Sequence, residues 1–321
     1  MDEEGGEPAS LFSRLKKAMA KVRIIERAKH LGSIASVWER LYSDKPDRTM
    51  FQQLDVNRAI ATLFEEREHL YVVCVETADG AAIIPACVRR DCVSLIGEEL
   101  FDYRDVLADD AHALDIAWRE IESIGLEVKV KAVRGKRQWA AMQPFTAAPF
   151  LPSTRRLSRN KDLERNLRKL VEAKCELKSL ANESDLHSGV HTFYRLKGKQ
   201  QAGSLFADPL RVEAMVKMVG LPALHPELHV ITRDERTIAA VLTFVDGNVC
   251  RFYGTYFDQE WGRYSPGVSL LYRVVRQAQS RHLHFDFMTG EQPYKLRFAS
   301  EVVPLYIAQR NAVERELVTA A

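Results

Sequence analysis

A candidate anion site lies where a helix is predicted to begin, within residues 263–269. Ser265 is expected to cap this helix, and Pro266 suits its first turn. Gly267 has no side chain, so a ligand can approach the backbone closely. Because the free N–H groups of a first helical turn and the helix dipole attract anions, a pyrophosphate would fit here. The residues predicted to bind it are Arg263, Ser265, Pro266, Gly267, Val268 and Ser269.

Further reactive side chains follow the strand predicted over residues 282–287. Strand alternation places Asp286 on the face opposite its two phenylalanine neighbours. Tyr294 and Lys295 come shortly after this strand. A carboxylate, a phenol and a cation near a phosphate-binding helix are the residue types of an acid–base reaction site. A purely structural ion pair between the aspartate and the lysine is the alternative.

The elements that must position these residues occur twice along the chain. Each half holds three strands, a loop, a helix and a fourth strand, and a glycine ends the third strand, at Gly97 and Gly254. We interpret this pattern as an internal duplication, with a chance match between two α/β halves as the alternative. Strands are predicted at 69–76, 81–88, 92–96 and 126–133 with a helix at 110–124, and again at 229–232, 237–245, 249–257 and 282–287 with a helix at 268–279.

The two copies differ where their helices begin. The second copy has the serine–proline–glycine sequence, whereas the first has Ala108, Asp109 and Asp110. Two carboxylates cap a helix well but repel a diphosphate. The anion site is therefore expected in the second copy only.

The boundary between the halves is predicted near residue 150. Residues 144–153 hold three prolines, which favour an extended chain. We expect a tail with an amphipathic helix over residues 1–30, an N-terminal domain over 31–150 and a C-terminal domain over 151–321.

Two basic segments have helical spacing. Residues 155–178 are interpreted as a solvated helix face, with RNA or phosphate binding as the alternative. Residues 11–29 are interpreted as a basic amphipathic helix that docks on its own domain, with contact to a membrane surface or a partner as the alternative.

Length and composition exclude several classes of protein. The chain has 321 residues, which predicts two domains or one large one. Hydrophobic residues make up 46% and charged residues 28%, so disorder and collagen are excluded. The net charge of +2 gives no global basic field for nucleic acid, and DNA is not an expected partner. Five cysteines without C-x-x-C spacing predict buried thiols and no metal site, and no secretory signal is recognised, so we expect a cytoplasmic protein.

The motifs of both halves together resemble the CelD/BcsL family of GNAT-superfamily acyltransferases, which are linked to cellulose and other exopolysaccharide biosynthesis. The resemblance covers roughly residues 50–300. In the second half it rests on Phe252–Phe257, on Ser265-Pro266-Gly267, on Phe285-Asp286-Phe287 with Gly290, and on Tyr294-Lys295. In the first half it rests on Phe51-Gln52, on Ile84-Pro85, and on Gly97 with Asp102-Tyr103.

The resemblance implies an α/β (α+β) fold of two tandem GNAT-like domains, each with a mixed, mostly antiparallel sheet flanked by helices. It also implies an acyl-CoA donor, with acetyl-CoA first, and acyl transfer to an amine or hydroxyl of a sugar or of a polysaccharide or cell-envelope precursor. Asp102 and Tyr103 would contact the acceptor. The catalytic residues would be Asp286 as proton acceptor, Tyr256 or Tyr294 as proton donor to the leaving thiolate, and Lys295 as a neutralising cation.

Two other functions stay open. A Fem-type relative would take its group from aminoacyl-tRNA, and the basic segment 155–178 is the sequence feature that favours this. A GNAT-shaped binding protein without catalysis, within a polysaccharide-synthesis assembly, is the third hypothesis. A covalent cysteine intermediate is not expected, because no cysteine lies in these motifs.

Overall fold

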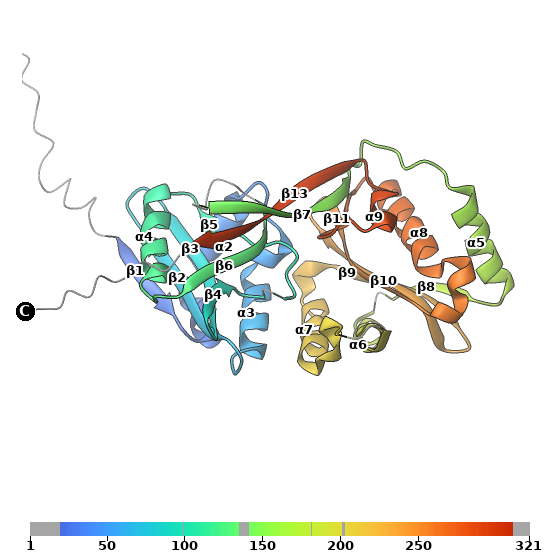
Figure 1. Cartoon of the computed structure of the whole chain (residues 1–321), viewed down its shortest axis with the longest axis horizontal. Helices are drawn as coiled ribbons and strands as arrows, with labels where there is room; N and C mark the ends of the chain where they lie inside the picture. Colours follow the sequence, from blue (N-terminus) through green and yellow to red (C-terminus); the bar gives the residue numbers. More distant parts are fainter. Residues whose placement is uncertain (1–19, 98, 135–140, 181, 201–202, 311–321) are drawn as a thin grey trace, which may run out of the picture.

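The computed structural model describes residues 20–310, except 98, 135–140, 181 and 201–202. Its strands form one 13-stranded sheet that runs through both halves of the chain (Figure 1). The strand order is β1-β2-β3-β4-β6-β13-β7-β12-β11-β10-β9-β8, and the short β5 pairs with β3 outside this path. The tandem mixed α/β fold expected from the sequence is confirmed.

The first half supplies one end of the sheet. Its strands are β1 (Lys21–Ile25), β2 (His69–Glu76), β3 (Ala81–Arg89), β4 (Cys92–Leu95), β5 (Leu107–Ala108) and β6 (Glu127–Val133). Its helices are η1 (Ala28–Ile34), α2 (Ala35–Asp44), η2 (Met50–Gln52), α3 (Leu54–Leu63) and α4 (Ala111–Glu122). Helix α4 packs on β2 and β3, while α2 and α3 belong to the opposite face.

The second half repeats this layout at the other end. Its strands are β8 (Glu176–Leu180), β9 (Pro226–Arg233), β10 (Arg236–Asp246), β11 (Val249–Phe257) and β12 (His284–Asp286). Its helices are α5 (Lys161–Glu172), α6 (Glu183–Gln200), η3 (Leu205–Ala207), α7 (Pro209–Val219), η4 (Pro222–Leu224), η5 (Gln259–Tyr264), α8 (Pro266–Ser280) and α9 (Pro293–Leu296). Helix α8 packs on one face of this end of the sheet, and α6 packs on the other.

The pairing pattern supports the duplication. Most neighbouring strands are antiparallel, and each half has a parallel pair at the same place in its repeat, β4 with β6 and β11 with β12. In each half a helix connects the two parallel strands, α4 in the first and α8 in the second. Parallel neighbours need such a crossover connection, so the sequence order and the pairing agree.

Two long strands join the halves at the centre of the molecule. Strand β7 (Ala141–Leu151) pairs with β12 of the second half, and β13 (Glu301–Arg310) pairs with β6 of the first half. The two strands also pair with each other along most of their length. Since one sheet is continuous across the halves, the division near residue 150 stays a prediction.

The prediction of one helix over residues 11–29 is wrong for its C-terminal part. Lys21–Ile25 form the edge strand β1, which pairs antiparallel with β2 over five residues. Arg23 also forms an ion pair with Glu76 of β2 at 2.6 Å. Pairing with a neighbouring strand overrides the helical spacing of this basic segment. Residues 11–19 lie outside the described residues.

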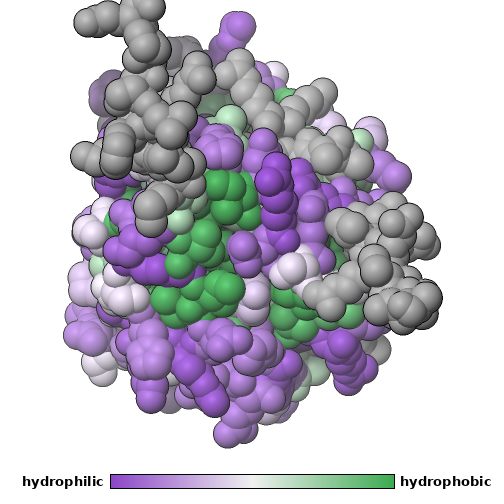
Figure 2. All heavy atoms as spheres, turned by 90° about the vertical axis from the view of Figure 1, so that its left-hand side faces the viewer, coloured by the Kyte–Doolittle hydropathy of each residue, from purple (hydrophilic) through white to green (hydrophobic). Residues whose placement is uncertain are grey.

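This edge strand lies at one end of the molecule, and its outward side chains are apolar. Val22 and Ile24 are 37% and 40% exposed. Figure 2 looks at this end and shows apolar side chains gathered between polar ones. The sheet therefore ends here on a partly apolar face.

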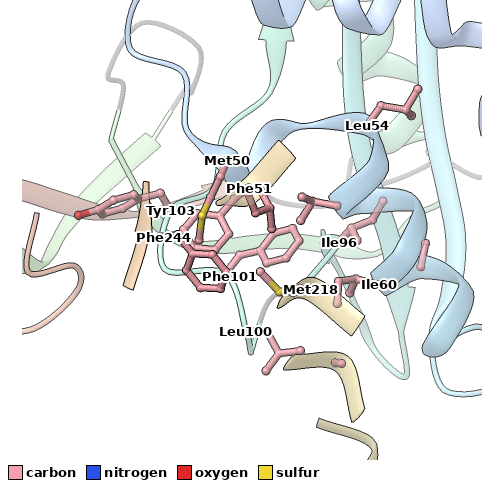
Figure 3. Close-up of a cluster of buried hydrophobic side chains, with 14 of the residues drawn as sticks. Met50, Phe51, Leu54, Ile60, Ile96, Leu100, Phe101, Tyr103, Met218 and Phe244 are labelled. Carbon is pink, nitrogen blue, oxygen red and sulfur yellow. The ribbon is translucent and has the colours of Figure 1, made fainter. Parts of the chain in front are cut away.

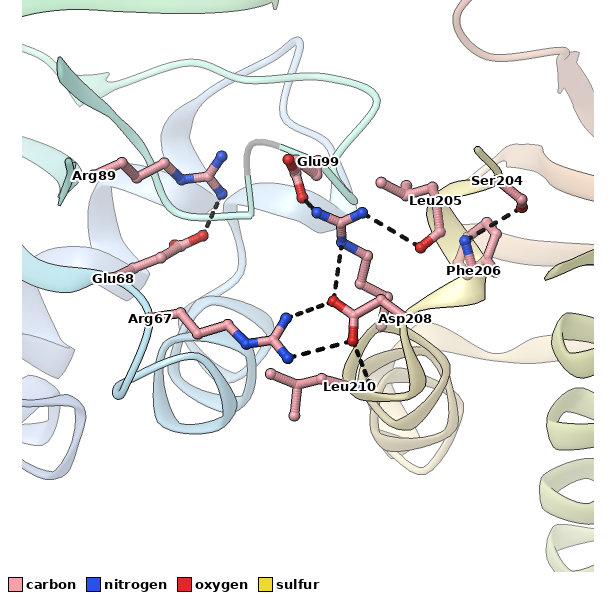
Figure 4. Close-up of polar contacts among 10 residues, drawn as sticks. Arg67, Glu68, Arg89, Glu99, Ser204, Leu205, Phe206, Asp208 and Leu210 are labelled. Atoms are coloured by element: carbon pink, nitrogen blue, oxygen red, sulfur yellow. Dashed lines mark hydrogen bonds and ion pairs between the residues drawn. The ribbon is translucent and has the colours of Figure 1, made fainter. Parts of the chain in front are cut away.

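The halves share one hydrophobic core. Phe51 and Phe101 from the first half lie in the same buried cluster as Met218 of α7 and Phe244 of β10 (Figure 3). Ion pairs join the rim of this interface (Figure 4): Arg67 pairs with Asp208. Each half also has a smaller core of its own, under α4 and under α8. The packing therefore fixes the halves against each other.

Candidate active site

A cleft opens where the two parallel strands of the second half separate. Strand β11 pairs with β12 only through Val249–Arg251, whereas β11 itself continues to Phe257. The cleft beside its far end has a volume of about 640 Å³, within the range of small-molecule sites. Its described lining residues are Asp102, Lys197, Gln200, Ser204, Phe252, Tyr253, Gly254, Thr255, Phe257, Gln259, Met288, Thr289, Gln292, Tyr294 and Lys295.

The same place in the first half is filled. Strand β4 pairs with β6 only at Cys92 and Val93, so these strands also separate. Aromatic side chains occupy the space beyond them and leave a cavity of only about 10 Å³, whose lining includes Phe51 and Phe101 (Figure 3). A Cβ on Gly97 would lie 2.7 Å from the Phe101 ring. Of these two equivalent places, only the one in the second half can admit a ligand.

Three charged side chains meet in the cleft, and they come from both halves. Asp102 belongs to the first half, Lys197 to α6 and Lys295 to α9. Burial raises the pKa of Asp102, and the neighbouring Lys295 opposes this rise. Burial lowers the pKa of Lys197 to about 8 and that of Lys295 to about 8, against the opposing charge of Asp102. The cleft thus holds one carboxylate and two ammonium groups that are poorly solvated.

Lys295 is fixed by the turn that follows β12. Its Nζ donates a hydrogen bond to the carbonyl of Thr289 at 2.7 Å, and it lies over the Phe252 ring. The Thr289 hydroxyl donates to the carbonyl of Asp102 at 2.8 Å. This chain of contacts connects the first half to α9 across the cleft. Asp102 and Lys295, predicted as an acceptor contact and a catalytic cation, are therefore brought together.

Asp286 is buried in a hydrogen-bonded network. Its Oδ1 accepts from the Tyr103 hydroxyl at 2.6 Å and from the Met288 N–H at 2.8 Å. Its Oδ2 accepts from Arg251 Nη1 at 2.7 Å. Asp286 is only 3% exposed, and it is not among the described residues that line the cleft. Both oxygens therefore accept hydrogen bonds from Tyr103, Met288 and Arg251, and the catalytic role of Asp286 stays a prediction.

Arg251 also belongs to this hydrogen-bonded network, and it was not predicted from the sequence. It is 4% exposed, and its Nε also donates to Asp246 Oδ2 at 2.7 Å. The same Asp246 oxygen accepts from the backbone N–H of Met50 in the first half. A charged residue inside the apolar strand 249–257 was the available signal, because a buried charge requires partners. The network holds the halves together beside the cleft.

The two tyrosines predicted as proton donors, Tyr294 and Tyr256, lie in different surroundings. Tyr294 lines the cleft and packs edge-on against Phe252 at 6.4 Å between ring centroids. Burial raises the pKa of Tyr294 to about 12, so its hydroxyl keeps its proton at neutral pH. Tyr256 packs against the core shared by the halves and is not among the described lining residues. The Tyr103 hydroxyl donates a hydrogen bond to Asp286 within the buried network next to the cleft.

Lys197 was also missed. It lies in a helix whose sequence, FYRLKGKQ, offers several cations of equal weight, so the sequence alone could not select it. The packing of α6 on the sheet distinguishes Lys197 from the other cations of this helix. A Cβ on Gly254 would lie 3.0 Å from Lys197 Nζ, so this ammonium lies directly against β11. The absence of a side chain at Gly254 is what admits Lys197 there.

The start of α8 adjoins the cleft at Phe257 and Thr255. A Cβ on Gly267 would make ordinary contacts of 3.4 Å with both of these residues. Pro266 has no N–H, and Ser269 N–H makes the first intrahelical bond, to the Ser265 carbonyl. The N–H groups of Gly267 and Val268 precede that bond, as an anion site at a helix N-terminus requires.

One detail of the predicted anion site, the Ser265 cap, needs correction. Ser265 has a left-handed backbone, and its side chain makes no capping hydrogen bond. Arg263 is exposed and lies over the Tyr264 ring. The described lining of the cleft reaches Gln259 but does not include residues 263–269. These residues therefore form an edge of the site next to the cleft.

The helix of the first half has the opposite character. The Asp110 side chain accepts from the N–H groups of His112 and Ala113, so it caps α4. Asp109 accepts from the Ala81 N–H and pairs with Arg40. A hydrogen bond from Thr77 lowers the pKa of Asp110, which keeps this cap ionised. The start of α4 is therefore closed to anions, in agreement with the difference between the copies.

Metal clusters and membrane-spanning helices are absent from the described residues. No cluster of three or more histidine, cysteine, aspartate or glutamate side chains in residues 20–310, outside the gaps named above, could hold a metal ion. None of the helices in the same ranges is long and apolar enough to cross a membrane.

Solved structures with the same fold cover nearly the whole chain. A tandem GNAT protein from the clavulanic acid biosynthesis pathway has a TM-score of 0.55 at 8% identity, over 92% of this chain and 99% of its own. FemX has 0.54 at 8% identity, over 91% and 98%. L-PGS from Bacillus licheniformis has 0.57 at 8% identity, over 87% and 92%. At such identities these likenesses define the fold, two GNAT-like units in tandem.

The family comparison adds the class of the second unit. Residues 157–296 match the model described as an acetyltransferase (GNAT) domain. This portion of the chain is a GNAT-type acetyltransferase domain. It contains β11, α8 and Lys295, and thus most of the cleft. No curated protein sequence matches the chain.

Proposed function

We propose that the protein is an acyl-CoA-dependent N- or O-acyltransferase, with acetyl-CoA as the first donor to test. The observation that carries the proposal is the open cleft between β11 and β12, which meets the start of α8 at one end and three charged side chains at the other. The acetyltransferase domain match includes the start of α8, Lys197 and Lys295, whereas Asp102 lies outside the matched residues.

The cleft has the parts that a long acyl donor needs. The far end of β11, beyond Arg251, has no β12 partner, so its backbone can hydrogen-bond the amide groups of an extended pantetheine arm. The N–H groups of Gly267 and Val268 would bind the pyrophosphate, with Arg263 as a nearby cation. The thioester would then lie toward Gly254, close to Lys197, Lys295 and Tyr294.

The chemistry assigned to the side chains is a direct transfer. The acceptor amine or hydroxyl attacks the thioester carbonyl, the new C–N or C–O bond replaces the C–S bond, and the thiolate leaves. Asp102 accepts the proton of the nucleophile, because it lines the cleft and its raised pKa makes it a better base than an ordinary aspartate. Tyr294 donates a proton to the thiolate. Lys295 stabilises the negative charge that develops on the carbonyl oxygen.

The proposed acceptor is a sugar or a polysaccharide or cell-envelope precursor. This part rests on the resemblance to the CelD/BcsL acyltransferases of cellulose and exopolysaccharide biosynthesis. We propose that this transfer takes place in the cytoplasm.

One observation favours a second donor class, aminoacyl-tRNA as in Fem-type transferases. Helix α5, with exposed Lys161, Arg168 and Lys169, packs against α8 and η5 and so lies near the candidate donor site. Other cations of this segment are paired locally, Arg159 with Glu164 and Arg165 with Asp162. A basic surface near a donor site suits RNA as well as a nucleotide.

A thermal-shift panel separates the donors. Acetyl-CoA, CoA and charged and uncharged tRNA are each added to the protein at low and at moderate salt. A ligand that binds only the folded state raises the melting temperature, and the stabilisation grows with the logarithm of its concentration divided by its Kd. Stabilisation by acetyl-CoA supports the proposal, and stabilisation by tRNA with strong salt dependence replaces it with the second donor. No stabilisation by any of them supports a GNAT-shaped protein without catalysis.

A further inference from the structure

The charges in the cleft do not balance. Among its described lining residues Asp102 is the one carboxylate, while Lys197 and Lys295 are both cations. Asp286, the next carboxylate, is already bound by Arg251 and Tyr103. The cleft therefore carries an excess of one positive charge when both lysines are protonated.

The excess charge belongs to Lys197. Lys295 has a carbonyl partner at 2.7 Å and two nearby carboxylates, Asp102 and Asp286. Lys197 has no hydrogen bond or ion pair within the described part of the chain, and its Nζ lies 5.7 Å and 5.6 Å from the ring centroids of Phe193 and Phe206. A poorly solvated ammonium without an ion-pair partner is costly, so a bound anion would stabilise it.

Polar groups beside Lys197 fit the same anion. Gln200 lies one turn further along α6, and Ser204 follows the helix; both line the cleft. Gln200 donates to the Phe257 carbonyl, which fixes its place at the far end of β11. Gly254 has no side chain, which lets the Lys197 ammonium lie against β11, and both residues line the cleft that a ligand would enter.

We propose that Lys197 is the binding site for an anionic group of the acceptor, a carboxylate or a phosphate carried close to the nucleophile. Identifying the ligand as the acceptor rests on the proposed function, but binding of the anion can be measured without turnover. It narrows the substrate class to acidic sugars, sugar phosphates or similar acids. A neutral sugar would leave Lys197 without a partner.

The groups around Lys197 determine how pH acts on this site. The titratable groups that face it are Asp102 from the first half, Lys295 from α9 and Tyr253 from β11. Lys197 is charged below a pH of about 8, so an anion binds best below that value and weakens above it. Asp102 lines the same cleft and its carboxylate opposes an anion when it is ionised, which makes Lys197 the residue that attracts the ligand.

The test uses three probes on one scaffold: glucose, glucuronate and glucose 6-phosphate. Each is titrated into the full chain at pH 7 while the Nζ signals of 15N-labelled lysines are followed by NMR. Glucuronate or glucose 6-phosphate is expected to bind and to raise the pKa of Lys197 from about 8 toward that of an ordinary lysine, and glucose is expected to do neither.

The matched variants are Lys197→Gln and Lys199→Gln. Lys199 is exposed, carries the same charge two residues further on and does not line the cleft. The first change should weaken binding of the anionic probe by about tenfold or more, and the second should leave it nearly unchanged. Gly254→Ala, which brings a Cβ to 3.0 Å from Nζ, should weaken binding less than Lys197→Gln.

Several results would overturn the proposal. These are equal effects of glucose and its acids, equal effects of the two lysine variants, or no binding of either acid. If CoA alone raises the pKa of Lys197, the site belongs to the donor and the proposal is also wrong. Acetyl-CoA binding is measured separately, so a failure of the proposed transferase function is distinguished from a failure of the anion site.

Discussion

At the scale of single residues, the charged side chains near the cleft divide by their contacts. Arg251 binds both Asp286 and Asp246, and Asp246 also binds the first half. Arg251 and Asp286 are buried, and Asp246 is partly buried. Asp102 and Lys197 line the cleft and are less fully paired. Groups of the first kind hold the site in place, whereas groups of the second kind are free to act on a ligand. Substitutions in the two groups should therefore have different consequences.

Asp102→Asn and Asp286→Asn should separate these roles. Asp102→Asn is expected to lower kcat by about 10²- to 10⁴-fold, with less than about 1 kcal/mol change in the free energy of unfolding, because it removes a base. Asp286→Asn is expected to destabilise the fold by about 2–3 kcal/mol, because Arg251 keeps only Asp246 as its charged partner. Steady-state kinetics and urea denaturation of both variants measure this. A large loss of kcat for Asp286→Asn without a loss of stability would restore it as the base.

Lys197→Met should make the protein more stable at neutral pH. The pKa of Lys197 is about 8 in the folded chain and near 10.4 when unfolded, so the unfolded chain binds more protons between these values. The stability of the natural protein therefore rises with pH across this window, and the methionine variant lacks that rise. Its advantage should be about 1–2 kcal/mol at pH 7 and vanish near pH 10.5. Thermal melts at several pH values measure this difference, with Lys199→Met as the control. The same pH dependence of stability in both variants would contradict the prediction.

At the scale of elements, the sequence predicted what depends on local spacing. The strands around Asp79-Gly80 and around Asp246-Gly247 and the helices at α4 and α8 lie close to their predicted ranges, because hydrophobic period and turn residues determine them. The edge strand at Lys21–Ile25 was not predicted, because it forms through pairing with the distant β2 and its own residues have helical spacing.

The candidate site was predictable only in part, for the same reason. Gly267, Tyr294 and Lys295 have local signals and lie at or beside the cleft. Arg251 has a local signal, a charge inside an apolar strand, but its partner Asp286 lies in a distant segment. Lys197 has no local signal, because its position depends on contact with the distant Gly254.

The start of α8 is tested by Gly267→Asp against Gly267→Ala. In both variants the added Cβ makes 3.4 Å contacts, and a carboxylate at a helix N-terminus does not destabilise the helix. The aspartate should weaken acetyl-CoA binding by about tenfold or more through repulsion of the pyrophosphate, and the alanine should have little effect. Equal affinities of the two variants for acetyl-CoA, measured by calorimetry, would show that the pyrophosphate does not bind at the start of α8.

At the scale of the whole molecule, the halves are one packed unit with two unequal clefts. Their shared core, the central β7–β13 pair and the Arg251 network leave no boundary that could open without breaking buried contacts. The first copy has filled its cleft with aromatic side chains, and the second has kept it open. We infer that the first half contributes Asp102 and rigidity, while the second half binds the donor.

Phe51→Ala tests whether the halves unfold together. Removing this buried ring from the shared core should cost about 3–5 kcal/mol. Hydrogen exchange should then accelerate equally in β3 of the first half and β10 of the second half. Val171→Ala, at a side chain that is 57% exposed, is the control and should change neither. Faster exchange in β3 alone would show that the halves are independent.

The central claim is that this chain has one acyl-CoA site, located in the second half. Calorimetric titration with acetyl-CoA tests it most directly, because it reports both binding and the number of sites. The account predicts saturable binding of one acetyl-CoA per chain, since the equivalent place in the first half has room for only about 10 Å³. No binding, or binding of two molecules per chain, would contradict it.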